Sequence, residues 1–243
     1  MKKIIAAVAV LAISSLTAFA LDITVGARGN LNLGFGTCLV EDYKESAQTL
    51  KDMASGGGTW DEGGNTGGGF GLYANFGLLE LGGGSLGIQP EIIMNFNNGY
   101  NYMIQIGTSK LERSFYKTTI DIPLLVTFTY PVMDTFSVGG GIGPYFSIPV
   151  MIDSQRKITS SPTTKESDDY TMKSGMNFGL AFDVNGAYKV GPGDIVLDLR
   201  YMLDFNPTTV TRIDKSTGIT VEDNDNLFKR GIFTIGLGYQ IKF

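Results

Sequence analysis

The stretch GIFTIGLGYQIKF, residues 231–243, alternates between large apolar residues and small or polar ones. One face carries Phe233, Ile235, Leu237, Tyr239, Ile241 and Phe243, and the other carries Thr234, Gly236, Gly238, Gln240 and Lys242. A period of two is that of a β-strand, in which successive side chains point to opposite faces. We expect a neighbouring strand to hold this segment, because chain ends fray when nothing ties them down.

The same alternation recurs along the whole chain. In residues 22–36 the odd positions, such as Val25 and Leu31, are mostly apolar, while the even positions, such as Arg28 and Asn30, are mostly polar. The predicted strands cover residues 22–36, 68–81, 86–97, 114–130, 135–149, 174–190, 194–205 and 229–243. The sequence therefore predicts an all-β protein of eight strands.

The first 20 residues have the pattern of a secretory signal peptide. Lys2 and Lys3 precede an apolar run from Ile4 to Ile13, and Ala18 and Ala20 form a small-residue cleavage site around Phe19. A membrane anchor is the alternative, but the run is shorter than the ~20 residues that a spanning helix needs. We expect cleavage before Leu21, so that residues 1–20 are the signal peptide and residues 21–243 the barrel domain.

The net charge of the chain limits the kinds of partner it can have, and its glycine content and lack of long apolar runs limit the kinds of fold. Loss of Lys2 and Lys3 changes the formal charge from −5 to −7, which argues against nucleic acid as a partner. Glycine is abundant, at 33 of 243 residues, and is spread through the alternating segments, unlike in a flexible linker. Beyond the first 20 residues no long apolar run follows. A membrane protein without such helices has to be a closed β-barrel, since lipid cannot satisfy backbone hydrogen bonds.

The lengths of the connections favour a membrane barrel over a soluble sandwich. Tight turns are predicted at residues 82–84, 131–134 and 191–193, and long polar loops at residues 37–66, 98–113, 150–173 and 206–228. Strict alternation of short and long links sorts turns and loops to opposite ends, as in outer-membrane barrels. The predicted fold is an eight-stranded antiparallel up-and-down transmembrane barrel with short periplasmic turns and long external loops, located in the outer membrane of a diderm bacterium. Its first strand should pair with its last.

Aromatic residues on the predicted outward face gather near both ends of the strands. The loop-end group is Phe35, Phe70, Phe96, Tyr116, Phe146, Phe178, Phe205 and Phe233, and the turn-end group is Tyr130, Phe136, Tyr188, Tyr239 and Phe243. Two such girdles are typical of the two interfaces of a bilayer.

Three short motifs resemble strands of the PorT-like outer-membrane β-barrel domain family. IDIPLL at 120–125 resembles the family's EIPLL strand, GGGIGPY at 139–145 its GxGPY strand, and DLRY at 198–201 its D-x-RY strand. Pro123 and Pro144 fall inside these strands, where each removes a ladder donor, so we expect local bulges.

The final strand also resembles the recognition signal of outer-membrane barrels. The matching residues are Thr234, Gly236, Tyr239, Ile241 and Phe243. This resemblance implies that the barrel-assembly machinery reads this segment.

Enzymatic and metal-dependent functions find little support in the sequence. The chain has no histidine, and the barrel enzymes it could resemble use a catalytic histidine as base. A lone Cys38 without histidine is a poor nucleophile candidate, and imidazole metal sites are impossible. The acidic stretch at 223–226 lacks the glycine and the distal glutamate of a calcium loop. We therefore expect no catalytic residue, cofactor or metal.

The chemistry that remains is a set of charges predicted to face the lumen: Arg28, Glu91, Lys117, Asp121, Asp183, Lys189, Asp198, Arg200, Asp204, Arg230 and Lys242. Because uncompensated burial is costly, such charges must pair or contact water. If they pair, the lumen is a polar plug, and the protein is a structural or surface-interaction protein. If they contact water, it is a narrow channel for small or hydrophobic solutes. We expect a monomer in outer-membrane lipid, with an envelope protein or surface ligand as the possible partner of its loops.

Overall fold

The computed structural model describes residues 22–34, 38–39, 49, 52, 58–160, 163–167, 170–214 and 220–243. The strands of the main sheet are β1 (Asp22–Gly34), β3 (Thr59–Gly64), β4 (Thr66–Leu81), β5 (Gly84–Phe96), β6 (Tyr100–Ile106), β7 (Ser109–Met133), β8 (Phe136–Ser160), β9 (Thr163–Ser167), β11 (Asn177–Val190), β12 (Gly193–Asp204) and β15 (Gly231–Lys242). A smaller sheet contains β2 (Cys38–Leu39), β10 (Tyr170–Ser174), β13 (Thr208–Asp214) and β14 (Thr220–Lys229).

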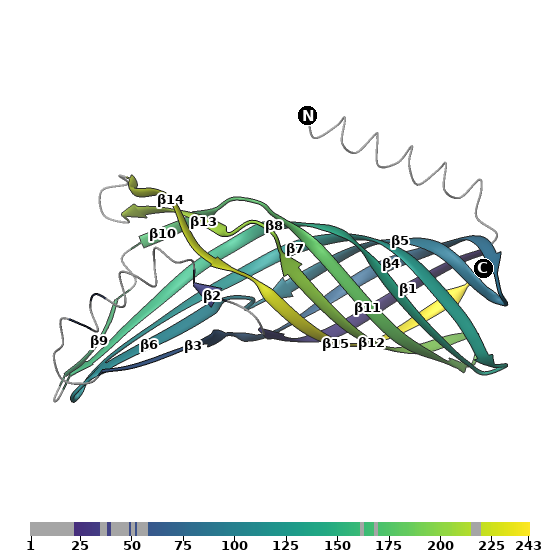
Figure 1. Ribbon diagram of the computed structural model, residues 1–243, viewed down its shortest axis with the longest axis horizontal. Coiled ribbons are helices and arrows are strands. Elements are labelled where there is room, and N and C mark those ends of the chain that lie inside the picture. Colours follow the sequence, from purple (N-terminus) through teal and green to yellow (C-terminus); the bar gives the residue numbers. More distant parts are fainter. Residues whose placement is uncertain are drawn as a thin grey trace.

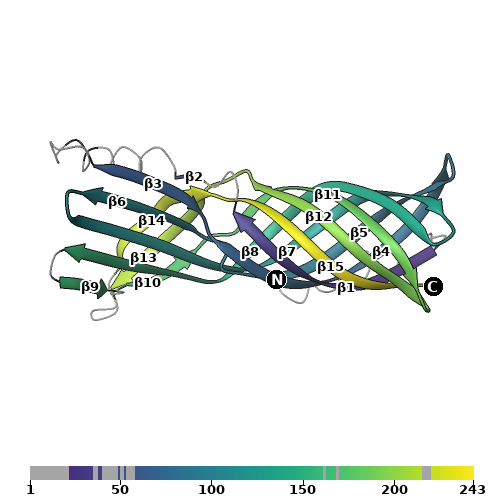
Figure 2. The same ribbon diagram turned by 90° about the horizontal axis from the view of Figure 1, so that it is seen from below.

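Eight of these strands close into a barrel. Their antiparallel order is β1, β4, β5, β7, β8, β11, β12 and β15, and β15 pairs again with β1. The first and last strands pair from Thr24 with Lys242 to Gly34 with Ile232, so the predicted closure is confirmed. Figures 1 and 2 show the tilted strands of this barrel, with the C-terminus at the end that carries the tight turns.

The tight turns fall where the sequence predicted them. The β4–β5 turn contains Gly82 and Gly83, whose φ angles of 60° and 85° lie in the left-handed region that favours glycine. Gly191, with a φ of 64°, adopts the same left-handed conformation in the turn between β11 and β12. These turns keep the hairpins short at one end of the barrel.

The distribution of side chains is the reverse of that in a soluble protein. Large apolar side chains such as Leu72, Ile92 and Leu237 are more than 60% exposed on the outer surface, whereas charged side chains are buried in the interior. In water this arrangement would expose a large apolar belt, but in a bilayer it places the apolar face against lipid. No helix in the described part of the chain is long and apolar enough to cross a membrane. The chain is an outer-membrane-type β-barrel.

The four long polar segments do link the barrel strands at one end, but their described residues are largely strands, so the expectation that they are loops was wrong. The hairpin β6–β7, the loop-side half of β8 and the strands β3, β9, β10, β13 and β14 continue beyond the barrel. Together they form what we term the loop-end extension. In Figure 1 the group β3, β6 and β9 and the group β10, β13 and β14 lie on opposite sides of this end.

The alternation in the extension has the opposite phase to that in the membrane. Tyr100, Tyr102 and Ile104 point inward and are at most 8% exposed, while Asn101 and Gln105 on the opposite face are exposed to solvent. The cluster of buried apolar residues is Tyr100, Tyr102, Ile104, Phe115, Ile152, Met172, Val210 and Phe228. Above the bilayer the outer surface meets water, so the apolar side chains turn inward and give the extension its own core.

The bulges expected at Pro123 and Pro144 are also absent from those positions. Pairing between β7 and β8 keeps one register from Pro123 with Tyr145 to Val126 with Ile142, although the pairs between them are missing. The prolines therefore interrupt hydrogen bonding without inserting a residue. The register shifts in this ladder lie between Thr118 and Thr119 and between Pro131 and Met133 instead.

Candidate functional site

The lumen contains nine of the eleven charged residues that the sequence placed there, whereas Lys189 and Lys242 are exposed at the turn end. Arg28, Glu91, Lys117, Asp121, Asp183, Asp198, Arg200, Asp204 and Arg230 are between 0% and 8% exposed. Eight of them come from the strands β1, β5, β7, β11 and β12, and Arg230 directly precedes β15. The fold brings them together as two networks.

The first group, termed the central charge network, contains Arg28, Glu91, Asp183, Asp198 and Arg200. The Glu91 carboxylate accepts hydrogen bonds from both Arg28 and Arg200, and one of the Arg200 contacts is 2.9 Å long. Arg28 also lies 3.1 Å from Asp198 Oδ2, and Arg200 lies 3.3 Å from Asp183 Oδ1. These contacts join β1, β5, β11 and β12 across the interior. Such charge-assisted hydrogen bonds are the strongest type for a buried ion pair.

A second group, termed the loop-side charge network, surrounds Arg230. Its Nη2 lies 3.3 Å from Asp121 Oδ1 and 3.4 Å from Asp204 Oδ1, and 3.1 Å from the Ser147 hydroxyl. The Tyr145 hydroxyl donates to the same Asp204 oxygen. Arg230 therefore connects the start of the last strand to β7, β8 and β12.

Lys117 is fully buried next to the apolar cluster of the extension. Its ammonium donates to Asn177 Oδ1 at 2.6 Å and to Thr208 Oγ1 at 3.1 Å. Two neutral acceptors satisfy part of the ammonium's hydrogen-bonding capacity, and the loop-side carboxylates balance its charge.

Asparagines fill the space between the charges, and they were not among the residues predicted as functional. Asn95 donates to Asp121 Oδ2 at 2.7 Å, and Asn30 and Asn32 both donate to Asn95 Oδ1 at 2.9 Å. Asn32 also accepts from Thr234 at 3.1 Å. All of them occupy inward positions, so the alternation that located the charges could also have located these amides.

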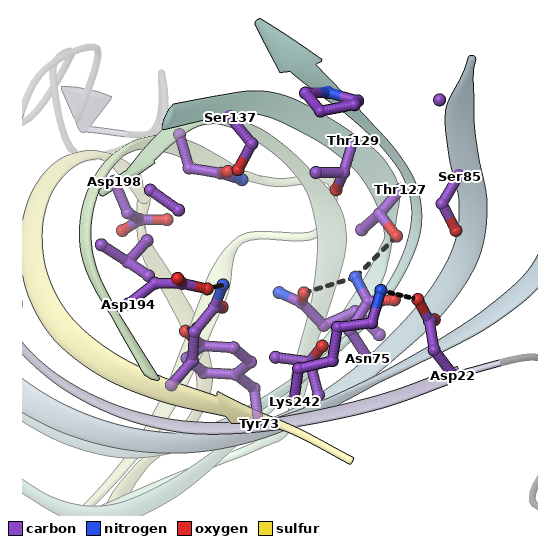
Figure 3. A pocket seen from close by; sticks show the side chains of 18 of the residues that line it. Asp22, Tyr73, Asn75, Ser85, Thr127, Thr129, Ser137, Asp194, Asp198 and Lys242 are labelled. Carbon is purple, nitrogen blue, oxygen red and sulfur yellow. Dashed lines mark hydrogen bonds and ion pairs between the residues drawn. The ribbon is translucent and has the colours of Figure 1, made fainter. Parts of the chain in front are cut away.

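At the turn end the interior opens into a chamber of about 380 Å³, which we term the turn-end chamber. Figure 3 shows polar side chains around it, including Tyr73, Asn75 and Asp194. The central charge network closes its inner end through Arg28, Asp183 and Asp198. Water from the turn side can therefore reach this network but meets the paired side chains beyond it.

At the other end the apolar cluster of the extension lies above the loop-side charge network. Trp60 stacks on Tyr102 with ring centroids 5.1 Å apart, and Tyr100 stacks on Phe228 at 5.8 Å. Phe228 comes from the smaller sheet and Tyr100 from the main sheet, so this stack joins the two groups of strands. Along its axis the interior is open and polar at the turn end, charged in the middle and apolar at the loop end.

The structure offers no metal centre among the residues it describes, where no group of three or more acidic or cysteine side chains could hold an ion. Cys38 lies in β2. Ala18 and Ala20, the residues expected at the cleavage site, lie outside the described residues.

Residues of the expected assembly signal lie in β15 and just after it. Tyr239, Ile241 and Phe243 are exposed on the outer surface, with Phe243 at 77%, while Thr234 and Gly236 are buried on the inner face. The backbone of Phe243 exchanges hydrogen bonds with Ile23 at 2.8 Å and 3.5 Å.

The predicted girdles are visible in part as exposed aromatic pairs. Phe70 lies 6.0 Å from Phe96, and Phe178 lies 5.9 Å from Phe205 in an edge-on contact. At the turn end Tyr188 is 56% exposed. These rings are placed where they can contact the bilayer interfaces.

Comparison with known proteins found similar solved structures. No protein-family model and no curated protein matches the chain. Among solved structures, the outer membrane protein OprG from Pseudomonas aeruginosa is 10% identical, with 92% of this chain and 97% of that chain covered and a TM-score of 0.45. A major outer membrane protein from Thermus thermophilus is 14% identical, with coverage of 90% and 99% and a TM-score of 0.47. The outer membrane protease OmpT from Escherichia coli is 12% identical, with coverage of 91% and 95% and a TM-score of 0.40.

These similar structures are outer-membrane proteins. The assignment of this chain to the same class rests on its own closed ring of strands and its apolar outer face. It is an outer-membrane β-barrel protein.

Proposed function

We propose that the protein is a non-conducting barrel of the PorT-like type, which acts as a structural or surface-interaction protein through its loop-end extension. The observation that carries this proposal is the pair of charge networks that cross the lumen. An eight-stranded barrel has an interior just wide enough for side chains to fill, and here those side chains are paired ions. Ions passing through would have to break buried pairs, which is costly.

The extension supports the second half of the proposal. Its strands carry polar residues outward, among them the pair Lys110 and Glu112, with 2.7 Å between Nζ and Oε1. Its stacked aromatic core fixes these strands to one another. A rigid polar surface on the external side suits contact with an envelope protein or a surface glycolipid. No catalytic role is proposed, because the chain has no histidine to act as a base.

Conductance of the purified barrel in planar bilayers tests the proposal. We expect no steady conductance from the unaltered protein. Arg28→Ala and Arg200→Ala should introduce leak, because Arg28 bridges two carboxylates and Arg200 bridges three. Lys110→Ala, which alters only an exposed pair of the extension, should behave like the unaltered protein.

The opposite result would favour the narrow channel. It would be a reproducible open state of the unaltered protein, with an ion selectivity that Arg28→Ala or Arg200→Ala changes. The turn-end chamber would then be the entrance of a path for small solutes.

A further inference from the structure

The turn-end chamber is strongly acidic. Its lining contains five carboxylates, those of Asp22, Glu80, Asp183, Asp194 and Asp198, and only two cationic side chains, those of Arg28 and Lys242. Its volume of about 380 Å³ falls within the range of sites for small molecules, roughly 300–1,000 Å³. Figure 3 shows Asp194 and Asp198 on one wall, with Asp22 and Lys242 across the chamber from them.

The closed end of the chamber carries an excess of negative charge. The central charge network contains two guanidinium groups and three carboxylates, and all five side chains are at most 8% exposed. In the loop-side charge network, Arg230 and the nearby Lys117 balance Asp121 and Asp204 in number. One negative charge of the central network is therefore uncompensated by the described residues. A buried charge of this kind calls for a positive partner.

Asp198 is the carboxylate with unused bonding capacity. It is 2% exposed, and its Oδ2 lies 3.1 Å from Arg28 and 3.5 Å from Arg200. Its Oδ1 is buried and has no hydrogen-bond partner among the described residues. Its neighbour Asp183, in contrast, uses one oxygen for Arg200 and the other for Asn185 at 2.8 Å. The open acceptor thus belongs to the network that carries the charge excess, on a residue that lines the chamber.

The acidic groups nearer the mouth differ in their partners. Asp22 pairs with the largely exposed Lys242, and Asp194 accepts from Gln240 at 3.1 Å. These contacts are at the rim, where water and salt weaken them and a ligand can replace them. A ligand with several positive charges could therefore reach from the rim to Asp198.

We propose that the turn-end chamber binds a linear aliphatic polyamine, with one ammonium group next to Asp198 and the others towards Asp194 and Glu80. An ammonium supplies three donors and one positive charge, which match the open acceptor and the charge excess. The methylene chain can pack on Ala187, Val196 and the Tyr73 ring, which line the same space. A divalent metal fits less well, because no group of three acidic side chains is arranged for one within the described residues.

Isothermal titration calorimetry of the folded full-length mature protein in detergent, with spermidine as the probe, tests this proposal. We expect saturable binding with one molecule per barrel. Asp198→Asn keeps the shape of the side chain but removes the excess charge, so the affinity should fall at least tenfold. The control Asp134→Asn removes an acidic charge at the β7–β8 turn, which does not line the chamber, and should leave affinity unchanged.

Folding of each variant is checked by migration of unheated samples on gels. If Asp198→Asn fails to fold, Asp194→Asn provides the second test, with an expected loss of several-fold. The proposal is overturned if the unaltered protein binds no spermidine. It is also overturned if the Asp198 and Asp134 variants lose affinity equally, because binding would then reflect the overall negative charge. A calorimetric signal that comes only from proton uptake would show that a proton balances the excess charge instead.

Discussion

Replacing Arg230 by methionine should destabilise the barrel strongly. Methionine keeps most of the apolar length of the side chain but removes the guanidinium, which contacts Thr119, Asp121, Ser147 and Asp204 at 3.1–3.4 Å. The two carboxylates would then be buried with only Lys117 nearby as a cation. Breaking a buried ion pair by removing one partner typically costs about 3–5 kcal/mol. We expect a loss of that size in the free energy of unfolding.

The exposed ion pair at the chamber rim provides the matched control. Lys242 pairs with Asp22, but its side chain is 64% exposed. An exposed pair contributes about 0.2–1 kcal/mol, so Lys242→Met should cost no more than that. Adding Asp121→Asn and Asp204→Asn to Arg230→Met should restore much of the stability, because the unpaired charges disappear.

Urea unfolding from lipid vesicles, followed by circular dichroism of the strands and by gel migration of unheated samples, measures both effects. The reasoning would be refuted if Arg230→Met and Lys242→Met lowered stability equally. It would also be refuted if the two added asparagines made the Arg230 variant worse, since the cost would then come from lost shape and hydrogen bonds and not from unpaired charge.

Further outcomes are expected from the fold and from the sequence signals. Unheated and boiled samples should migrate differently on gels because the closed ring resists detergent; identical migration would argue against the barrel. Phe228→Ala should loosen the loop-end extension by about 3–5 kcal/mol, seen as faster proteolysis of the extension while the barrel stays intact; simultaneous loss of both would contradict this. Mass spectrometry of envelope protein should find Leu21 as the first residue, not Met1. Phe243→Ala should lower the inserted amount without reducing secretion, and an unchanged outer-membrane yield would remove it from the assembly signal.

The alternating pattern predicted the barrel wall and the contents of the lumen well. The alternation along each strand was enough to place Arg28, Glu91 and Arg230 in the lumen, because every second residue of a strand faces the same side. It could not predict that Arg200 would meet Glu91, since these residues are 109 positions apart and their strands are not neighbours. Contacts across the lumen depend on how far each strand is staggered around the ring, which no local pattern contains.

The same alternating pattern did not predict the strands of the loop-end extension. In the barrel wall the apolar positions face outward, but this holds only where the strand is surrounded by lipid. Tyr100, Tyr102 and Ile104 alternate clearly, but as an inward apolar face with polar residues outside. The segment follows Asn97, whose φ of 58° marks a turn, and its many polar residues led to the prediction of a loop. The segment does alternate with a period of two, but its apolar residues face inward and its polar residues face outward.

The length of β7 and β8 sets the place at which other molecules can meet this protein. The outward apolar side chains of β7 begin near Ile122, whereas the strand itself begins at Ser109. At roughly 3.3 Å per residue, about 40 Å of the length of β7 lies beyond the apolar belt. Because the strand is tilted, its height above the belt is smaller than this length. A protein that binds the β6–β7 hairpin at Gly107 would thus lie well above the lipid head groups. Hydrogen bonds between the strands of the loop-end extension fix this height. Changes at that tip alter what is recognised without altering how far from the membrane recognition takes place.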